Sequence, residues 1–218
     1  MKWFATGDFH FNHWNIVKYT NRPFKTIEHM NETLIKNYNE RVKPEDHCII
    51  CGDFIFKNSA GGKPGEGLPE PWTKFWDRLN GIKTLVRGNH DRGNSAKTIV
   101  ENMVVGFGGY RIGVIHDPAD FLESVSWNEV DFNICSHVHN NWLYIFRGHQ
   151  LEHFILNVGV DVHHFRPITF DEILKTRSRI LKQQSSYRQR DEHNKLMAAN
   201  YHKSTDDKQG ELNEESGG

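Results

Sequence analysis

The sequence of 218 residues predicts an α/β protein. Up to about His116, short apolar runs of β type alternate with segments whose apolar residues recur at helical spacing. Strand-like runs dominate from there to about residue 170, and polar side chains follow most of these runs directly. The length suggests one domain, or one domain and a tail. We place the domain at residues 1–182 and a polar tail, disordered or loosely helical, at residues 183–218.

The composition excludes several classes of protein. A formal net charge of −1 argues neither for nor against a polyanionic partner. Three cysteines are too few for a disulfide framework and favour a reducing compartment. Cys48 and Cys51 lie in an apolar strand-like run, where residues three apart face opposite sides, so we interpret them as core thiols and not as a redox or zinc pair. The chain lacks a leader-like start and an apolar run long enough to span a bilayer, so we expect a cytoplasmic protein without a membrane partner.

Eight short apolar runs are expected to form strands, because they are bounded by turn residues and rich in side chains that favour strands. They cover residues 2–6, 47–51, 84–87, 110–115, 132–135, 143–146, 153–157 and 166–170. The runs at 143–146 and 153–157 are expected to pair with each other. The order of the runs, with helical segments between the early ones, indicates at least one sheet covered by helices.

Four segments are expected to form helices, at residues 26–41, 71–79, 94–103 and 171–181. Thr26 is the expected N-cap of the first helix. The aromatic stripe of the second helix, with Trp72, Phe75 and Trp76, is interpreted as core packing and not as a platform for stacking bases. The segment 57–71 is rich in Gly and Pro and is either a lid over a site or a plain connection.

Polar side chains able to bind a metal follow five of the strands. They are Asp8 and His10, Asp53, Asn89 and His90, His116, and His137 and His139. Residues two apart project to one side of an extended chain, which suits chelation by Asp8 with His10 and by His137 with His139. Each strand end alone has the simpler interpretation of a turn or a helix cap, and Asp91 either orients His90 or caps the next helix. Five such ends together indicate a site at the edge of a sheet.

The ligand types indicate which metals the site takes. Imidazole, carboxylate and amide groups without a thiolate suit borderline divalent ions such as Mn, Fe, Zn or Ni, with Mn favoured. The number of candidate ligands exceeds what one tetrahedral ion needs. It suits two divalent ions about 4 Å apart that share a bridging carboxylate.

The order of these blocks resembles the calcineurin-like metallophosphoesterases. That family has Asp-x-His, Gly-Asp, Gly-Asn-His-Asp/Glu, a lone His and Gly-His-x-His. The corresponding blocks here are Asp8-Phe9-His10, Gly52-Asp53, Gly88-Asn89-His90-Asp91, His116 and His137-Val138-His139. The blocks span about two thirds of the chain. Two further blocks, residues 21–24 (Asn-Arg-Pro-Phe) and 157–161 (Asn-Val-Gly-Val-Asp), resemble a small branch found in bacteria and phages.

The resemblance implies a fold and a set of residue roles. The implied fold is a four-layer α/β/β/α sandwich of two mixed sheets. Asp8, His10 and His139 would hold one metal ion, Asn89, His116 and His137 would hold the other, and Asp53 would bridge the two ions. A metal-bridging hydroxide would attack phosphorus in line with the leaving oxygen. His90 would assist the leaving group and Asp91 would fix the tautomer of His90, so these two are the expected catalytic residues.

Two positions depart from the expected pattern, and four more are candidates for contact with substrate. Ser136 stands where the family usually has Gly, which permits backbone conformations closed to Ser. Asn12 stands where a Gly is expected before His13. Residues that lie near the blocks and are candidates for binding the phosphate or substrate are His13, Arg87, Asn140 and Arg166. The remaining histidines are interpreted as surface or packing residues.

The predicted function is hydrolysis of phosphate esters, with phosphodiesters favoured and a small phosphoester or nucleotide as substrate. Phosphomonoesters and pyrophosphates are alternatives, because the family cleaves all three. A nuclease is a further alternative, since Lys175, Arg177, Arg179, Lys182, Arg188 and Arg190 make the last helix and its extension basic, although the overall charge does not favour nucleic acid. A scaffold without catalysis, like the retromer subunit of this family, is less favoured because His90 and every expected ligand are present. The sequence leaves the oligomeric state open.

Overall fold

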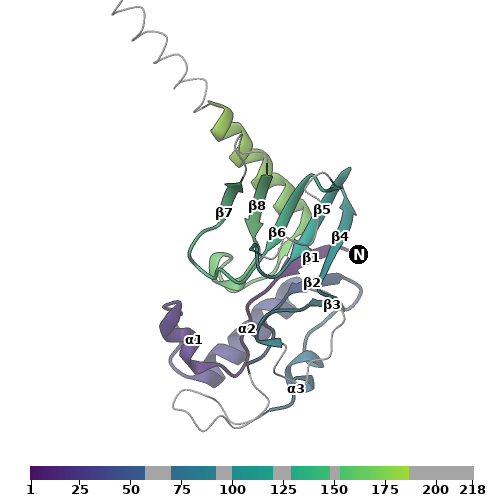
Figure 1. The fold of residues 1–218 in the computed structure, drawn as a ribbon. Helices are drawn as coiled ribbons and strands as arrows, with labels where there is room; N and C mark the ends of the chain where they lie inside the picture. The colour runs from purple at the N-terminus through teal and green to yellow at the C-terminus, as the bar shows by residue number, and fades with distance from the viewer. Residues whose placement is uncertain (57–69, 92–99, 120–128, 148–152, 187–218) are drawn as a thin grey trace, which may run out of the picture. The chain divides into compact units, whose positions relative to one another are not determined.

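The computed structural model describes residues 1–56, 70–91, 100–119, 129–147 and 153–186. The chain divides into two compact units, Met1–Ile173 and Leu174–Gly218. The first unit contains both sheets and all the candidate site residues (Figure 1). Most of the predicted loop at 57–71 and the tail beyond residue 186 lie outside the described residues, so the lid and the boundary at residue 182 stay predictions.

The first sheet has four strands in the order β3-β2-β1-β9. They are β1 (Trp3–Thr6), β2 (His47–Cys51), β3 (Ile82–Val86) and β9 (Ile168–Thr169). β2 pairs in parallel with both β1 and β3, whereas β9 runs antiparallel to β1. The parallel pairing places the carboxyl ends of β1, β2 and β3 at one edge of the sheet, where the polar blocks begin.

Three helices share a hydrophobic core with the strands of the first sheet: α1 (Trp14–Tyr19), α2 (Ile27–Arg41) and α3 (Thr73–Trp76). Thr26 caps α2 as predicted, because its hydroxyl accepts a hydrogen bond from the His29 amide. Met30 and Tyr38 of α2 share one core with apolar side chains of β1 and β2. Trp72, Phe75 and Trp76 belong to the same core, which confirms that the aromatic stripe packs inward, although α3 is shorter than the predicted helix.

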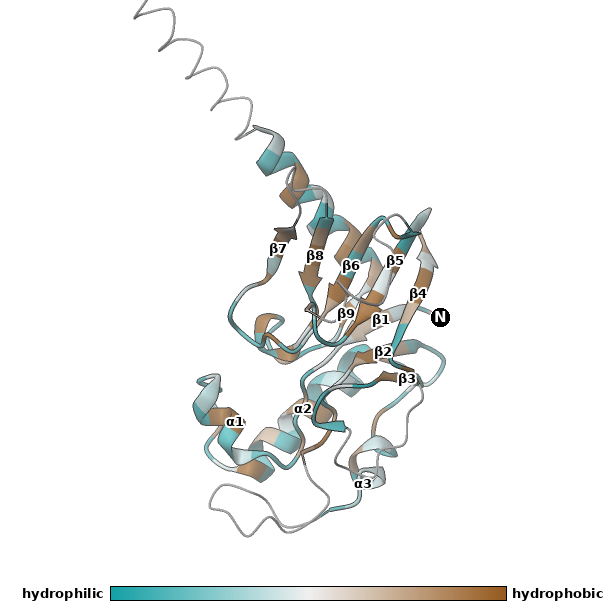
Figure 2. Cartoon of the chain, in the orientation of Figure 1, coloured by the Kyte–Doolittle hydropathy of each residue, from teal (hydrophilic) through white to brown (hydrophobic). Residues whose placement is uncertain are grey.

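The second sheet has five strands in the order β4-β5-β6-β8-β7. They are β4 (Asn102–Phe107), β5 (Tyr110–Ile115), β6 (Phe132–Cys135), β7 (Tyr144–Arg147) and β8 (His153–Asn157). β5, β6 and β8 run parallel, while β4 and β7 at the two edges run antiparallel to their neighbours. Apolar residues line these strands (Figure 2). Two mixed sheets with flanking helices confirm the predicted α/β fold class.

One predicted helix is wrong at its C-terminal end. Asn102, which the helix over 94–103 was to include, begins β4 and pairs with Ile115 of β5. Gly108 and Gly109 join β4 to β5, and their φ angles of 58° and 82° allow the tight turn of a hairpin. The sequence interpretation overlooked this pair of glycines. Residues 92–99 of the predicted helix lie outside the described part of the chain.

The last predicted helix extends from residue 170 to residue 186, the end of the described chain. Cys48, Cys51 and Cys135 are buried free thiols, as the core interpretation of the CxxC spacing predicts. Among the described helices, none has the length and apolar character that a membrane span needs. The described N-terminal helix α1, by contrast, was not predicted.

Candidate metal centre

The polar blocks that follow the strands converge in space, as the sequence predicts. Side-chain atoms able to bind a metal lie within 4.8 Å of one another in three overlapping groups. The groups are Asp8, His10 and His139; His10, Asp53 and His90; and Asp53, His116 and His137. Asn89 joins the third group, because its Oδ1 lies 2.9 Å from His116 Nε2 and 3.0 Å from His137 Nδ1. The structure therefore brings all seven predicted ligands together.

The backbone that presents these side chains is not extended, in contrast to the sequence argument. The φ angles are 57° at Asp8, 50° at His10, 50° at Asp53, 70° at His137 and 48° at His139. These left-handed conformations are unfavourable for residues other than Gly, at about 1–3 kcal/mol each, and they cluster at functional sites. The ligands converge because the chain turns sharply after each strand, and not because alternate residues of a strand face one side.

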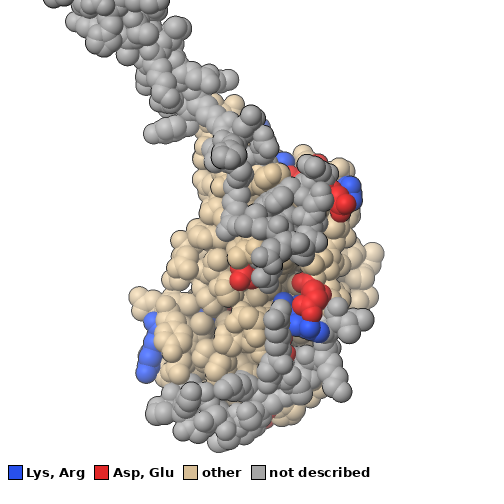
Figure 3. All heavy atoms as spheres, in the orientation of Figure 1, with Lys and Arg blue, Asp and Glu red and all other residues tan. Residues whose placement is uncertain are grey.

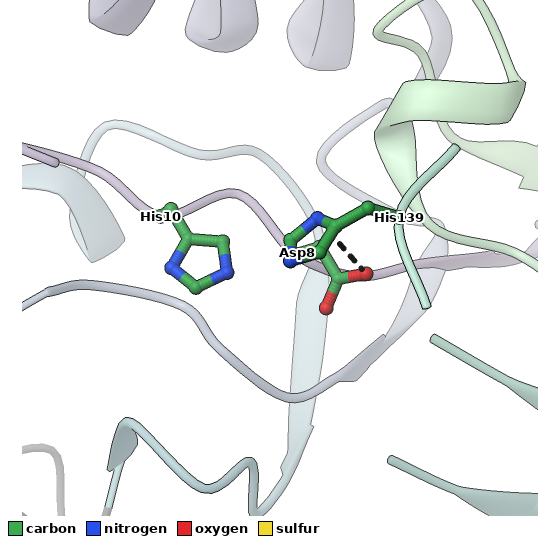
Figure 4. A group of neighbouring side chains, drawn as sticks. All are labelled: Asp8, His10 and His139. Carbon is green, nitrogen blue, oxygen red and sulfur yellow. Dashed lines mark ion pairs between the residues drawn. The ribbon is translucent and has the colours of Figure 1, made fainter. Parts of the chain in front are cut away.

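The first group combines two buried side chains with a half-buried one (Figure 4). His139 Nδ1 lies 3.8 Å from Asp8 Oδ2, and the ring centroids of His10 and His139 are 5.1 Å apart. Within the described residues, Asp8 Oδ2 and both ring nitrogens of His10 are buried without a hydrogen-bond partner. Such orphaned atoms are costly to bury. A divalent cation fits here, because it would satisfy Asp8 Oδ2 and one of the two ring nitrogens of His10.

Burial shifts the protonation of this group. It raises the pKa of the Asp8 carboxyl. It also holds the pKa of His10 well below the usual range of an imidazole, so His10 is neutral at neutral pH. The neutral imidazole is the form that binds metal ions.

The other set of candidate ligands, opposite Asp8, His10 and His139, contains His116, His137 and Asn89. His137 Nδ1 lies 3.2 Å from His116 Nε2. His116 Nδ1 lies 2.8 Å from the Cys51 carbonyl oxygen and 3.0 Å from Ser136 Oγ, so Nδ1 carries a proton and Nε2 is directed to the cluster. Burial alone would lower the pKa of His116, but its hydrogen bond to Asp53 and the negative charges of the site raise it to about 9.

Asp53 lies between the two groups. Its Oδ2 is 3.4 Å from His10 Nε2 and 3.4 Å from His116 Nε2, while its Oδ1 accepts a hydrogen bond of 2.9 Å from the His90 amide. Burial alone would raise the pKa of Asp53, but His116 and the other nearby imidazoles hold it below the usual range of a carboxyl. This carboxylate therefore lies between the two sets of candidate ligands, and its role as a bridge between two ions stays a prediction.

Asp91 stabilises the turns that carry the ligands. Its carboxylate accepts hydrogen bonds from the amides of Gly88 at 2.8 Å, Asp53 at 2.9 Å and Phe54 at 3.1 Å. These bonds tie the end of β3 to the end of β2. The sequence analysis did not foresee this role, and the predicted role of Asp91 at the His90 ring stays a prediction.

His90 and His13 extend the cluster on the side of His10. The half-buried His90 ring has its centroid 5.1 Å from that of His10 and 5.5 Å from that of Phe56. The ring of His13 stacks on that of Phe56 with 3.7 Å between the centroids, and its centroid lies 6.0 Å from that of His90. Burial lowers the pKa of His13 to about 4. His13 is therefore the predicted substrate contact that the structure places beside the metal ligands.

The three other predicted substrate contacts have structural partners. Arg87 pairs with Glu101, and Arg166 lies 3.5 Å from Glu40. Asn140 donates a hydrogen bond of 3.0 Å to the Thr20 carbonyl oxygen. The role of these three side chains at the phosphate stays a prediction.

The two departures from the family pattern are accommodated in different ways. Ser136 is not among the described residues with positive φ, so its position does not require Gly. Room for its side chain comes from Gly7, where a Cβ would lie 2.7 Å from Ser136 Oγ. Asn12 has a φ of 64°, in the left-handed region that Asn tolerates better than most residues.

Sequence reasoning gave no role to Arg22 or Asp161, although it noted the blocks that contain them. Asp161 Oδ2 lies 3.0 Å from His139 Nδ1, and Arg22 pairs with the same carboxylate. Burial alone would raise the pKa of Asp161, but the hydrogen bonds from His139 and Arg22 lower it. The two blocks therefore lie beside the metal ligands, and only their joint resemblance to one branch hinted at this.

Comparison with known proteins found relatives of the chain and of its fold. No protein-family model matches the chain. The uncharacterised protein MJ1445 from Methanocaldococcus jannaschii is 34% identical over 174 residues, which are 80% of this chain and 90% of that protein. The crystal structure of AQ665, a protein of unknown function from Aquifex aeolicus, is 24% identical, covers 80% of this chain and 98% of its own, and has a TM-score of 0.57, so it shares the fold. Zinc-bound Vps29 from Entamoeba histolytica is 17% identical over 73% of this chain and 74% of its own, with a TM-score of 0.40, too low to support an argument.

Proposed function

The chain belongs to the same family as MJ1445, and we propose that it is a calcineurin-like metallophosphoesterase that hydrolyses phosphate esters with two divalent metal ions. The observation that carries the proposal is the position of Asp53. A single oxygen of its carboxylate lies 3.4 Å from a histidine of each ligand group. One shared carboxylate between two sets of ligands is the arrangement that suits a pair of ions.

Two sets of residues would hold the ions. Asp8, His10 and His139 would bind one, and Asn89, His116 and His137 would bind the other, with Asp53 shared. The mixed nitrogen and oxygen ligands favour Mn²⁺, with Fe, Zn or Ni as alternatives. When bound, such ions offset the negative charge of a phosphate ester and lower the pKa of water.

The protein's own residues complete the reaction. We assign to His90 the transfer of a ring proton to the leaving oxygen, because its half-buried ring lies beside the ligand groups while its amide is fixed by Asp53. The stacked rings of His13 and Phe56 lie beside His90 and would help to orient the ester. We favour phosphodiesters because the segments between the site blocks are short and contain no inserted cap domain that would close over the phosphate.

Hydrolysis of an aryl phosphodiester and the matching aryl monoester tests this proposal. The purified chain is expected to turn over the diester faster when Mn²⁺ is added, and to lose this activity with a chelator. Glu32→Gln, which removes only the exposed pair with Arg78, provides a matched control that should retain activity. A folded chain that turns over neither ester with Mn, Fe, Zn or Ni would contradict the proposal and favour a scaffold.

Metal binding is expected to release protons, because His116 has a pKa of about 9 before metal binds. At pH 7 this imidazole is protonated, and Nε2 must lose its proton before it coordinates an ion. Affinity for Mn²⁺ should therefore rise by up to about tenfold per pH unit from pH 6 to pH 8 and level off as the pH passes the pKa of His116. Calorimetric titration at pH 7 in buffers of different ionisation enthalpy counts the protons released. Affinity that does not change with pH, with no proton released, would show that His116 is not a ligand.

A further inference from the structure

We propose that the buried Arg22–Asp161 pair positions the ligand group of Asp8, His10 and His139, with Asp161 setting the tautomer of His139 and Arg22 holding the backbone at Asp8. This inference rests on the proposed function, because it takes these three residues to bind a metal ion. It gives a role to the two blocks, 21–24 and 157–161, that the metal ligands themselves do not use.

Arg22 holds the chain where it turns after β1. Its Nη2 donates to the Asp8 carbonyl oxygen at 2.7 Å, and its Nη1 donates to the Phe9 carbonyl oxygen at 3.0 Å. Both carbonyls belong to the stretch in which Asp8 and His10 adopt left-handed conformations. A planar, permanently charged guanidinium is suited to fix two successive carbonyls. Arg22 therefore stabilises the unfavourable backbone that makes two ligands converge.

Asp161 links Arg22 to His139. Its Oδ1 accepts from Arg22 Nε at 2.7 Å, and its Oδ2 accepts from Arg22 Nη2 at 2.9 Å and from His139 Nδ1 at 3.0 Å. An ionised carboxylate only accepts hydrogen bonds, so Nδ1 of His139 must hold the proton. The lone pair of the neutral ring is then on Nε2, which leaves that atom to coordinate an ion.

The rest of the block 157–161 contacts the same ligand group. Asn157 Nδ2 donates to the His139 carbonyl oxygen at 2.7 Å, and its Oδ1 accepts from the Gly159 amide at 2.8 Å. A Cβ on Gly159 would lie 2.9 Å from Asp8 Oδ2, so a larger residue here would displace the carboxylate of Asp8. One short block thus holds the backbone and the ring of His139 and leaves room for the carboxylate of Asp8.

The histidine rings of the other ligand group have partners of their own, although Asp8 Oδ1 accepts a hydrogen bond of 3.0 Å from the His137 amide. The Cys51 carbonyl oxygen and Ser136 hold the ring of His116, and Asp117 Oδ2 lies 3.5 Å from His137 Nε2. Loss of the Arg22–Asp161 pair should therefore weaken one metal site and spare the other. A pair that served only to stabilise the fold would not show this selectivity.

The pair Arg41–Glu172 offers a control with the same chemistry. Arg41 Nη2 lies 2.7 Å and 2.6 Å from the two carboxylate oxygens of Glu172. It joins similar parts of the sequence, but its side chains are 28% and 44% exposed, against 0% and 2% for Arg22 and Asp161. Glu172 also accepts from the Thr169 amide at 2.7 Å, so this pair holds β9 and not the ligands.

Asp161→Asn is the sharpest test, because it keeps the shape and removes one acceptor. An amide has a single acceptor oxygen, so either orientation places an NH₂ group against a donor of Arg22 or of His139. In titrations of the full chain with Mn²⁺, one of two ions should bind 10–100-fold more weakly and the other within about threefold of wild type. Glu172→Gln should leave both affinities unchanged. Arg22→Lys, which keeps the charge but loses the paired donors, should weaken the same ion if Asp161→Asn does not fold.

The tautomer of His139 provides a readout that does not depend on activity. In ¹⁵N-labelled, zinc-loaded protein, wild-type His139 should carry its proton on Nδ1, and a metal-free sample above the imidazole titration range should show the same form. Asp161→Asn should shift the proton to Nε2 or give a mixture. Unchanged affinities with an unchanged tautomer would overturn the inference.

The failures of the two proposals are distinguishable. A wild-type chain that binds two ions but turns over no ester would overturn only the function. A wild-type chain that binds neither Mn²⁺ nor Zn²⁺ would overturn both. Equal weakening of both ions in Asp161→Asn would assign the pair a general structural role instead.

Discussion

Asp53→Ala is expected to lose the bound metal ions, whereas His90→Ala is expected to keep them and lose most turnover. Asp53 Oδ2 lies 3.4 Å from a histidine of each ligand group, so removal of this carboxylate would leave two cations close together without the negative charge that offsets their repulsion. Removal of a general acid lowers the rate by roughly 10²–10⁴-fold, about 3–5 kcal/mol in the barrier. Metal analysis after gel filtration, paired with kinetics, measures both effects.

The choice of substrate sharpens this comparison. An ester with a good leaving group needs no proton, so His90→Ala should reduce its turnover far less than that of an alkyl ester. The alternative is that His90 itself binds a metal ion, because one of its ring nitrogens lies within 4.8 Å of candidate ligand atoms of His10 and Asp53. If His90→Ala removes metal as completely as Asp53→Ala does, His90 is a ligand and another group is the acid.

Gly88→Ala is expected to destabilise the fold by about 3 kcal/mol and to abolish metal binding. A Cβ at this position would lie 2.2 Å from Asp53 Oδ1 and 2.3 Å from the Asp53 amide nitrogen. The amide is held in turn by Asp91, so the backbone is unable to move aside without the loss of that hydrogen bond. Chemical denaturation with and without Mn²⁺ measures the two losses together.

Gly106→Ala is the matched control for this substitution. Gly106 lies in β4, and a Cβ there would meet no atom within 4 Å. Its free energy of unfolding should change by no more than about 0.5 kcal/mol, with metal binding intact. If Gly88→Ala behaves like Gly106→Ala, the close approach of β2 and β3 at the site is wrong.

The ligand set was predictable because each part of it is a local signal. Asp8 and Asp53 follow parallel strands of one sheet, His116 and His137 follow parallel strands of the other, and parallel pairing brings such ends to one edge within each sheet. The geometry of the ligands was not predictable in this way. The left-handed backbone at Asp8 and His139 leaves no mark in spacing or periodicity.

The support of the site was harder to predict than the site. Arg22 and Asp161 are 139 residues apart, and nothing in either neighbourhood shows that they meet. The strand at Asn102 was missed for a different reason, since a short run without strict alternation resembles the end of a helix until the turn at Gly108 is recognised. Local patterns thus revealed the elements and the ligands, while the contacts that orient the ligands depend on the complete fold.

The orphaned atoms of Asp8 and His10 make the lifetime of the protein depend on metal supply. A chain that buries polar atoms without partners is less stable than one that satisfies them, and a bound ion offsets part of this deficit. Each ion present at a hundred times its dissociation constant adds about 2.7 kcal/mol to the free energy of unfolding. In a cell short of the right metal, more of the chain would be unfolded at any moment and open to proteolysis. A shortage of the ion would then lower the amount of the protein in the cell as well as the activity of each molecule.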